Sequence, residues 1–350
     1  LMIKITHLEL IPPPHNAPPV EGDRIMFSVN LSSDGSLAGM YGQRTKSFEH
    51  YFGYWVNRNG TTTLYQPQYT PPASQVFWPM KLLNNSGKLA GCARLTDGSY
   101  RIFVIDTFSG DFTDIPIPTG IRQVSFYGIL DSGEILAHLD LFPGPTLLTT
   151  YILHLGISQP LSIPGYVQNM VNRHSPSENF FVLSARKSTD PTTNFRTLLI
   201  SGGLKIGGVI DVGDHIIVEI DDNGDYVRME RNNSAPSWEA PGTLIQNGAV
   251  VDIPNKFDGN KIVDPRQSIL RSDGVLLGVY RSSNKSGDYS GHFAFQDETI
   301  TDLMGGTALG ALQFRAIAPT KINSAGQVSL AVQGAGTKSL GWDSYRCFVT

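Results

Sequence analysis

The chain has 350 residues, longer than one hydrophobic core usually serves, so it comprises two domains or one architecture that extends as a single unit. Only 17% of the residues are charged, and the net charge of −4 comes from interleaved acidic and basic residues, which argues against a nucleic-acid-binding surface. No apolar run reaches the ~18 to 20 residues of a membrane span, and the N-terminus lacks the pattern of a signal peptide.

A strand is predicted over residues 2–10, and the rest of the chain repeats one pattern: an apolar strand, a turn rich in Asn, Asp or Ser, and a second apolar strand. The copies occupy residues 28–42, 80–94, 127–140, 171–186, 219–231, 268–281 and 320–333. Their turn positions are Gly35, Gly87, Gly133, Asn179, Gly224, Gly274 and Gly326, spaced by 52, 46, 46, 45, 50 and 52 residues. In the fourth copy we expect Asn179 to replace the glycine, because asparagine readily adopts the left-handed conformation. This spacing is typical of propeller blades, which run ~40 to 50 residues with four strands each.

A second hairpin follows each of the first six copies, over residues 50–66, 99–117, 149–163, 195–210, 241–253 and 290–303. The seventh copy is followed by a single strand, residues 343–350, and therefore lacks its fourth strand. Pairing the strand at residues 2–10 with this last strand would cover the open sheet edges. The sequence thus predicts an all-β fold: one seven-bladed β-propeller of four-stranded blades over residues 1–350, closed by the N-terminal strand completing blade seven.

Other sequence features add few constraints. The stretch 304–318 comes nearest to a helix, but its three glycines disfavour one. Cys92 and Cys347 fall on different blades, so we expect two small buried side chains and no disulfide framework. The eight histidines show no metal-ligand spacing, and no phosphate-binding loop or dinucleotide fingerprint occurs, so neither a metal nor a cofactor is predicted.

The turn motif resembles the HAF-type repeat, Asn-x-x-Gly-x-(Val/Leu)-x-Gly, of extracellular bacterial proteins. Residues 83–91 (LNNSGKLAG) and 322–330 (INSAGQVSL) carry the likeness best, although the second lacks the final glycine. This resemblance implies a propeller architecture and an extracellular or cell-surface location. It implies no activity.

The turns between first and second strands lie on one rim of a propeller, and we interpret them as architectural. The opposite rim, formed by the loops, is the expected binding face. Seven residues beyond each turn position, where the second strand ends, the chain has Gly42, Arg94, Asp140, Arg186, Arg231, Arg281 and Gln333. Together with Arg44, the four arginines are predicted to form an electropositive collar for an anionic ligand. The alternative is that each arginine pairs with an acidic residue or solvates the end of its strand.

Aromatic residues occur in the same loops, where they could stack on sugar rings or contact a protein. Trp238 and Trp342 are candidate ligand-binding residues, and the others are Tyr69, Trp78, Phe142, Tyr166, Phe195 and Tyr289. The alternative is that several of them fill gaps between blades. Catalysis at this rim would require proton-transfer groups, for which the candidates are His50, Tyr289, His292 and Asp343. No nucleophile motif accompanies these residues.

Three functions remain open at this point. The first is a recognition module that binds a glycan, anionic by the collar argument, or a protein partner at the loop rim. The second is a lyase or glycoside hydrolase acting on an acidic polysaccharide. The third is a structural subunit of a larger assembly. The fold cannot decide among them, because propellers support all three.

Overall fold

The computed structural model describes residues 3, 5–45, 48–143, 148–189, 195–231, 241–282, 289–304, 316–323, 326–333 and 341–349. The chain divides into two compact units. Unit 1 comprises Leu1–Ile11, Arg173–Val182 and Arg196–Thr350, and unit 2 comprises Pro12–Asn172 and Leu183–Phe195. The prediction of one domain over residues 1–350 stays a prediction.

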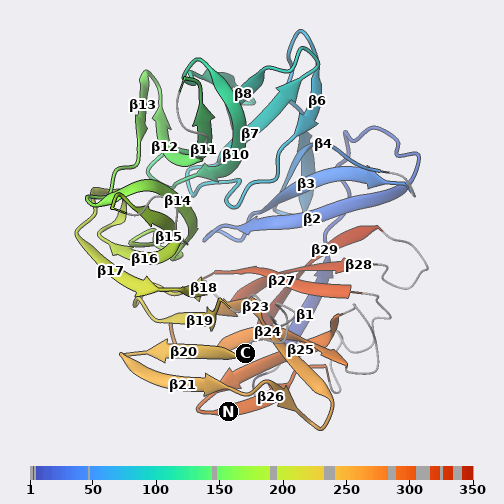
Figure 1. Ribbon diagram of the computed structural model, residues 1–350. Coiled ribbons are helices and arrows are strands. Elements are labelled where there is room, and N and C mark those ends of the chain that lie inside the picture. Colours follow the sequence, from blue (N-terminus) through green and yellow to red (C-terminus); the bar gives the residue numbers. More distant parts are fainter. Residues whose placement is uncertain are drawn as a thin grey trace. The chain divides into compact units, whose positions relative to one another are not determined.

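Antiparallel strands joined by short turns make up unit 2 (Figure 1). The first four are consecutive neighbours in a larger sheet and correspond to predicted blade one, and the next two groups of four are separate sheets that correspond to blades two and three. Their strands are β2 (Asp23–Leu31), β3 (Leu37–Arg44), β4 (Glu49–Arg58), β5 (Thr61–Tyr65), β6 (Ala73–Val76), β7 (Lys88–Leu95), β8 (Tyr100–Asp106), β9 (Phe112–Ile115), β10 (Ile121–Ile129), β11 (Ile135–Leu141), β12 (Thr149–His154) and β13 (Ile157–Pro160). Blade four follows with β14 (Tyr166–His174) and β15 (Phe180–Lys187), each of which has residues in both units.

Unit 1 continues the pattern through blades five to seven (Figure 1). Its elements are β1 (Ile5–Leu10), β16 (Arg196–Ser201), the 3-10 helix η1 (Gly203–Lys205), β17 (Gly208–Gly213), β18 (His215–Ile220), β19 (Tyr226–Glu230), β20 (Gly242–Gln246), β21 (Ala249–Ile253), β22 (Lys256–Phe257), β23 (Lys261–Leu270), β24 (Leu276–Ser282), β25 (Tyr289–Gln296), β26 (Thr299–Asp302), β27 (Ala316–Ile322), β28 (Gln327–Gln333) and β29 (Trp342–Val349). The all-β prediction is confirmed.

The N-terminal strand completes the last blade, as predicted. β1 pairs antiparallel with β29, with Ile5 opposite Val349 and Leu10 opposite Tyr345. Ile5 is 7% exposed and belongs to an apolar cluster of unit 1 that includes Tyr345 and Cys347. Burial of this side chain therefore adds packing energy to the backbone pairing of the two chain ends.

Six of the seven predicted turn positions have the left-handed conformation that favours glycine, with φ between 76° and 96°. Gly87 is typical: its N–H donates to the Asn84 carbonyl, and the Asn84 N–H donates to the Lys88 carbonyl. This is a type I turn followed by a left-handed residue.

The fourth turn corrects the prediction for Asn179. The left-handed residue is Glu178, with φ of 60°, and its N–H donates to the Ser175 carbonyl. The Ser175 N–H then donates to the Phe180 carbonyl, five residues ahead, where the other turns span four. Asn179 is thus an additional residue after the turn position, and its carbonyl accepts a hydrogen bond from Gly203.

The innermost strand of blade two is also less regular than predicted. β6 ends at Val76, and Pro79, which has no N–H, precedes a segment that bonds β10 at Lys81 and returns to β7 at Leu83, opposite Leu89. The N–H groups of Met80 and Lys81 both donate to the Tyr127 carbonyl. The Lys81 carbonyl then passes so close to Gly128 that a Cβ there would lie 1.7 Å from its oxygen, so glycine is required.

Buried apolar side chains fill the space between neighbouring sheets within each unit. In unit 2 one such cluster includes Tyr54, Leu89 and Phe103, and the next includes Cys92, Ile129 and Ile135. Both cysteines are buried and unpaired, and burial raises the pKa of the Cys92 thiol, as expected for an inert core residue. None of the described helices is long and apolar enough to cross a membrane, and much of the stretch predicted at 304–318 lies outside the described residues.

Candidate functional site

The predicted collar arginines make local contacts wherever their partners are described. The Arg44 guanidinium, at the end of β3, lies 3.2 Å from the Glu49 carboxylate at the start of β4. The Arg94 guanidinium lies 5.8 Å from the ring centre of Tyr100, and that of Arg186 lies 4.4 Å from the ring centre of Phe195. Of these side chains Arg94 is exposed, whereas Arg44 and Arg186 are partly buried. Of these three, Arg44 has the acidic partner that the alternative expects, and Arg94 and Arg186 contact aromatic rings.

Two collar positions show the same ion pair with its charges exchanged. In blade six Arg281 on β24 contacts the buried Asp264 on β23 at 3.5 Å. In blade three Asp140 on β11 is the buried partner, and it accepts a 2.7 Å hydrogen bond from Arg122 on β10. Both pairs join the first strand of a blade to the second, so they stabilise the sheet at its loop end. Arg231 is partly buried and follows β19 directly.

The weak catalytic candidates lie in different surroundings. His292 is 3% exposed, and burial lowers the pKa of its imidazole to about 4. His50, at the start of β4, contacts the Phe52 ring edge-on and pairs across the sheet with Gln43. Asp343 and Trp342 are partly buried on β29. Of Tyr289 only the backbone is described, and Trp238 lies outside the described residues.

An aromatic platform in unit 2 lies close to one of the predicted collar residues. We call Phe27, Tyr51 and Trp78, with the Arg44–Glu49 pair, the indole platform. Trp78 is 40% exposed, and its ring centre lies 4.8 Å from that of Phe27 and 5.7 Å from that of Tyr51, both in T-shaped contacts. These contacts fix the indole while much of it remains open to solvent.

Polar groups adjoin the aromatic rings of the platform. The Tyr51 hydroxyl donates a 3.2 Å hydrogen bond to the Glu49 carboxylate, which also pairs with Arg44. Burial, reinforced by the Glu49 charge, raises the pKa of the Tyr51 phenol, so this hydroxyl stays a donor. The platform therefore combines a flat apolar surface with a carboxylate, a guanidinium and a hydroxyl.

Sequence reasoning found Arg44, His50 and Trp78 but missed Phe27, Tyr51 and Glu49. These residues come from β2 and β4, whereas Trp78 follows β6 in the next blade. No local motif connects the three segments. The only usable signal was the position of Glu49 five residues after Arg44 in a short loop between predicted strands.

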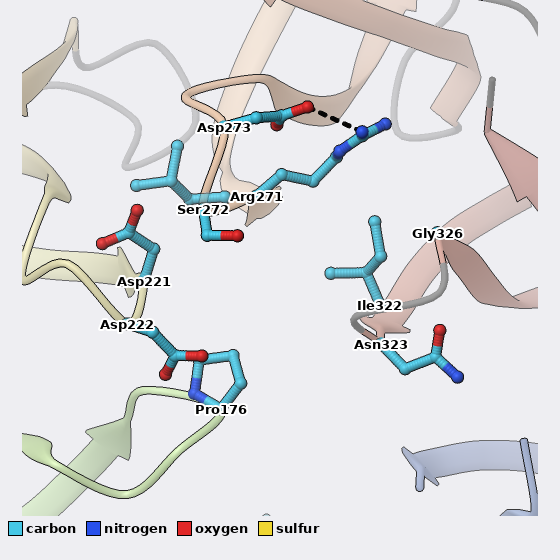
Figure 2. Close-up of a pocket in the computed structure, with 10 residues that line it drawn as sticks. Pro176, Asp221, Asp222, Arg271, Ser272, Asp273, Ile322, Asn323 and Gly326 are labelled. Carbon is cyan, nitrogen blue, oxygen red and sulfur yellow. Dashed lines mark hydrogen bonds and ion pairs between the residues drawn. The ribbon is translucent and has the colours of Figure 1, made fainter. Parts of the chain in front are cut away.

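A cavity of about 310 Å³ lies at the turn end of unit 1 (Figure 2). Asp221 and Asp222 lie on one side of it and Ile322 and Asn323 on the other. Most of its polar groups have partners: one Asp221 oxygen accepts from the N–H groups of Asn223 and Asp225, and Asp222 accepts from the N–H of Ser177. The cavity thus lies among turn residues that hold one another in place.

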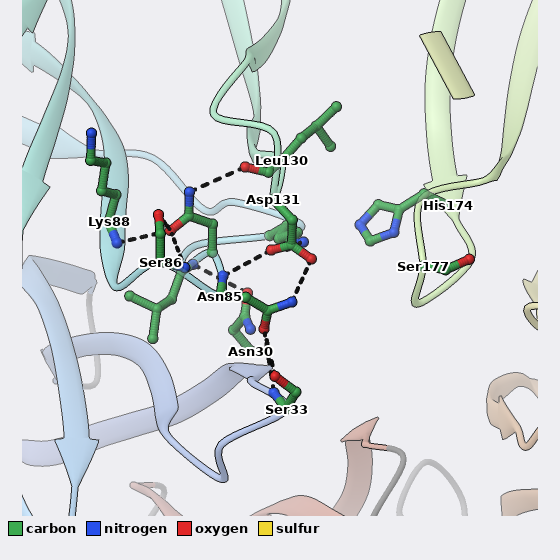
Figure 3. Close-up of polar contacts among 12 residues, drawn as sticks. Asn30, Ser33, Asn85, Ser86, Lys88, Leu130, Asp131, His174 and Ser177 are labelled. Atoms are coloured by element: carbon green, nitrogen blue, oxygen red, sulfur yellow. Dashed lines mark hydrogen bonds and ion pairs between the residues drawn. The ribbon is translucent and has the colours of Figure 1, made fainter. Parts of the chain in front are cut away.

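Hydrogen bonds also link the turns of neighbouring blades in unit 2 (Figure 3). Asn85 connects two of them: its side-chain oxygen accepts from the Ser33 hydroxyl at 3.1 Å, and its side-chain nitrogen donates to Asp131 at 2.7 Å. Asp131 also accepts from the Asn85 N–H and pairs with Lys81 at 3.0 Å. This observation supports the architectural interpretation of the turns.

The segment IDDNGD at residues 220–225 forms such a turn in unit 1, as the sequence predicts. Within the described residues, no three His, Cys, Asp or Glu side chains are grouped so that they could hold a metal ion.

No protein-family model matches the chain, and no curated protein matches it. Solved structures do match. The β-propeller domain of the trilobed protease from Pyrococcus furiosus is 11% identical over 94% of both chains, with a TM-score of 0.57.

Two kinds of complete peptidase also match. The acylaminoacyl peptidase of Pyrococcus horikoshii is 11% identical with a TM-score of 0.55, over 93% of this chain and 51% of that one. A prolyl endopeptidase is 10% identical with a TM-score of 0.59, over 94% of this chain and 50% of that one. The chain thus spans about half the length of these peptidases. At such low identity the likeness concerns the fold alone, and that fold is a β-propeller.

Proposed function

We propose that the chain is a recognition module that binds a glycan at the indole platform. The observation that supports this proposal is the exposed Trp78 indole, fixed by two aromatic rings beside an ion pair and a phenol. Sugar rings present a C–H face that stacks on a flat aromatic surface and hydroxyls that need both donors and acceptors. The platform offers each of these.

The platform has little net charge with which to select the charge of the glycan. Arg44 would favour an acidic sugar, but its pairing with Glu49 offsets this preference. We therefore expect the platform to recognise the hydroxyls of a glycan. Any higher affinity for uronates than for neutral sugars would come from arginines near the platform. Comparing the affinities of neutral and uronate glycans of equal length measures this preference.

The decisive variant is Trp78→Ala, measured by glycan array and then by calorimetry on the best ligand. Loss of the stacking surface should weaken binding at least about tenfold, which corresponds to roughly 1.4 kcal/mol. Phe108→Ala is the matched control, because Phe108 is an exposed aromatic residue on a different hairpin of unit 2. Equal affinity of both variants, or cleavage of the glycan by the wild-type protein, would contradict the proposal.

A second candidate is a propeller that serves a peptidase, either as part of a longer chain or as a partner. This candidate is favoured by the peptidases matched above, of which the chain covers about half. The same variants tested against a peptide array separate the two candidates. Peptide binding that needs Trp78, with no glycan bound, would favour the peptidase propeller.

Two further alternatives keep their own tests. An ultraviolet assay for unsaturated products on acidic polysaccharides tests the lyase interpretation. A protein that binds neither glycans nor peptides would instead fit a structural subunit.

A further inference from the structure

Unit 2 has a small hollow of its own, about the size of a single side chain. It measures about 200 Å³ and lies between the outer strands of blade two and the turn end of blade three. Val104, Ile115, Ile129 and Ile135 form its apolar floor, and the last three are at most 7% exposed. Since drug-sized ligands need pockets of at least about 300 Å³, this hollow suits one large aliphatic side chain.

The strand beside this hollow has a free edge. Among the described strands, β9 pairs with β8 alone, and its residues Phe112, Thr113 and Asp114 are exposed. The Asp106 N–H donates to the Asp111 carbonyl, and antiparallel pairs alternate between bonded and non-bonded. The pair of Val104 and Thr113 is therefore bonded.

It follows that the backbone groups of Phe112 and Asp114 point away from β8. They form a short row of donors and acceptors that another strand could pair with. Thr113 and Ile115, which alternate with them, line the hollow. A strand added at this edge would direct alternate side chains toward the same hollow.

The exposed residues around the hollow, which we call its lip, indicate what would lie next to the aliphatic side chain in a bound segment. Lys88 and His154 are exposed there, and Leu155 is 60% exposed on the turn after β12. The one carboxylate in the lining, Asp131, is engaged by Lys81 and Asn85. Lys88 thus gives the lip a positive charge that complements an acidic residue, with Asp106, its cross-strand neighbour on β8, as a competing carboxylate.

We propose that β9 accepts an extended segment of another protein as an added strand, with a large aliphatic side chain in the hollow and an acidic residue near Lys88 and His154. Backbone pairing would supply affinity, and the hollow and its lip would supply specificity. This inference goes beyond the proposed glycan site, because it uses different strands of unit 2.

Two substitutions at one position test the pairing. Asp114→Pro removes the outward N–H, whereas Asp114→Ala keeps it, and both remove the side-chain contact with Tyr69. The probe is a fluorescein-labelled heptapeptide with a central Leu flanked by Thr and Glu, measured by fluorescence anisotropy. We expect Asp114→Pro to weaken binding at least tenfold relative to Asp114→Ala. A probe with Lys in place of Glu should bind the wild-type protein more weakly.

Amide hydrogen exchange of the wild-type protein keeps the test valid should Asp114→Pro fail to fold. The bound peptide should slow amide exchange at Phe112 and Asp114. The Trp78→Ala variant should bind the peptide as tightly as the wild-type protein does. Equal binding by the Pro and Ala variants, protection elsewhere on the chain, or no binding at millimolar peptide would overturn the proposal.

Discussion

His292 is buried and His138 is partly buried in the sheets, at positions where a proton would be costly. Burial lowers the pKa of His138 and of His292 to about 4. The Nε2 atoms of both are buried and have no hydrogen-bond partner among the residues that the structure describes. In the unfolded chain both imidazoles would return to the ordinary pKa near 6.5.

Stability should therefore fall as the solution becomes acidic. The folded protein resists protonation between pH 6.5 and pH 4, whereas the unfolded chain takes up the protons, so stability is complete above pH 6.5 and declines below it. At pH 5 the loss is roughly 2 kcal/mol for each histidine. Urea unfolding at pH 7.5 and pH 5 measures this loss, and the His138→Gln/His292→Gln variant should lose less. An equally steep decline in that variant would assign the effect to the carboxylates.

Single residues also show why the collar could not be predicted in full. Arg281 and Asp264 are 17 residues apart in the sequence, and only the register of β23 and β24 brings them together. Arg94 has Tyr100 six residues ahead, a contact that sequence distance alone makes plausible. The repeat shows that arginines lie at these strand ends, but the residues that they contact depend on strand register.

At the level of elements, the N-terminal strand β1 is held in unit 1 by its pairing with the C-terminal strand β29. Ile5→Ala removes the buried side chain at its start and should cost about 2 to 5 kcal/mol. Deleting residues 1–10 should cost more, because it also exposes the edge of β29. Thr6→Ala is the control, since Thr6 is exposed on the same strand.

Thermal unfolding and amide exchange of β29 report these changes. Fast exchange at Arg346 and Phe348 is expected in the deletion variant and not in Thr6→Ala. An unchanged melting temperature on deletion would show that β1 contributes little to unit 1.

The elements were predictable where one local signal decides them. A glycine in a short polar turn locates a hairpin, and six such positions were predicted to the residue. The fourth turn was displaced by one residue because its closing hydrogen bond spans one residue more. The irregular strand of blade two depends on a hydrogen-bonded contact between Lys81 and β10, which no pattern within residues 80–94 reveals.

At the level of the whole molecule, stability is expected to depend on contacts between adjacent repeats. Within unit 2, β4 contacts β6 of the next blade and β7 contacts β10. The same property explains why the indole platform was not predicted as a unit. Its aromatic rings come from two blades, and their meeting requires the packing of one sheet on the next. Repeat spacing predicts the number of blades but not which faces meet.

The turn contacts allow this dependence on neighbours to be measured. The Asn85 side chain bonds the turn of blade one through Ser33 and the turn of blade three through Asp131, so Asn85→Ala removes both side-chain bonds at once and keeps the backbone N–H bond to Asp131. Each exposed hydrogen bond is worth about 0.5 to 1.5 kcal/mol, and the loss should be about 1 to 3 kcal/mol. Ser33→Ala removes one hydroxyl bond, keeps the longer Ser33 N–H bond to Asn85 and should cost less, and Ser132→Ala in the next turn should cost little.

Urea unfolding of the single and double variants measures the coupling. Because Ser33 and Asn85 share a bond, the cost of the double variant should be smaller than the sum of the two single costs. Additive costs would mean that neighbouring turns hold their conformations independently. In that case the blades of unit 2 would be joined through their apolar clusters alone, and the polar turn residues would only shape each hairpin.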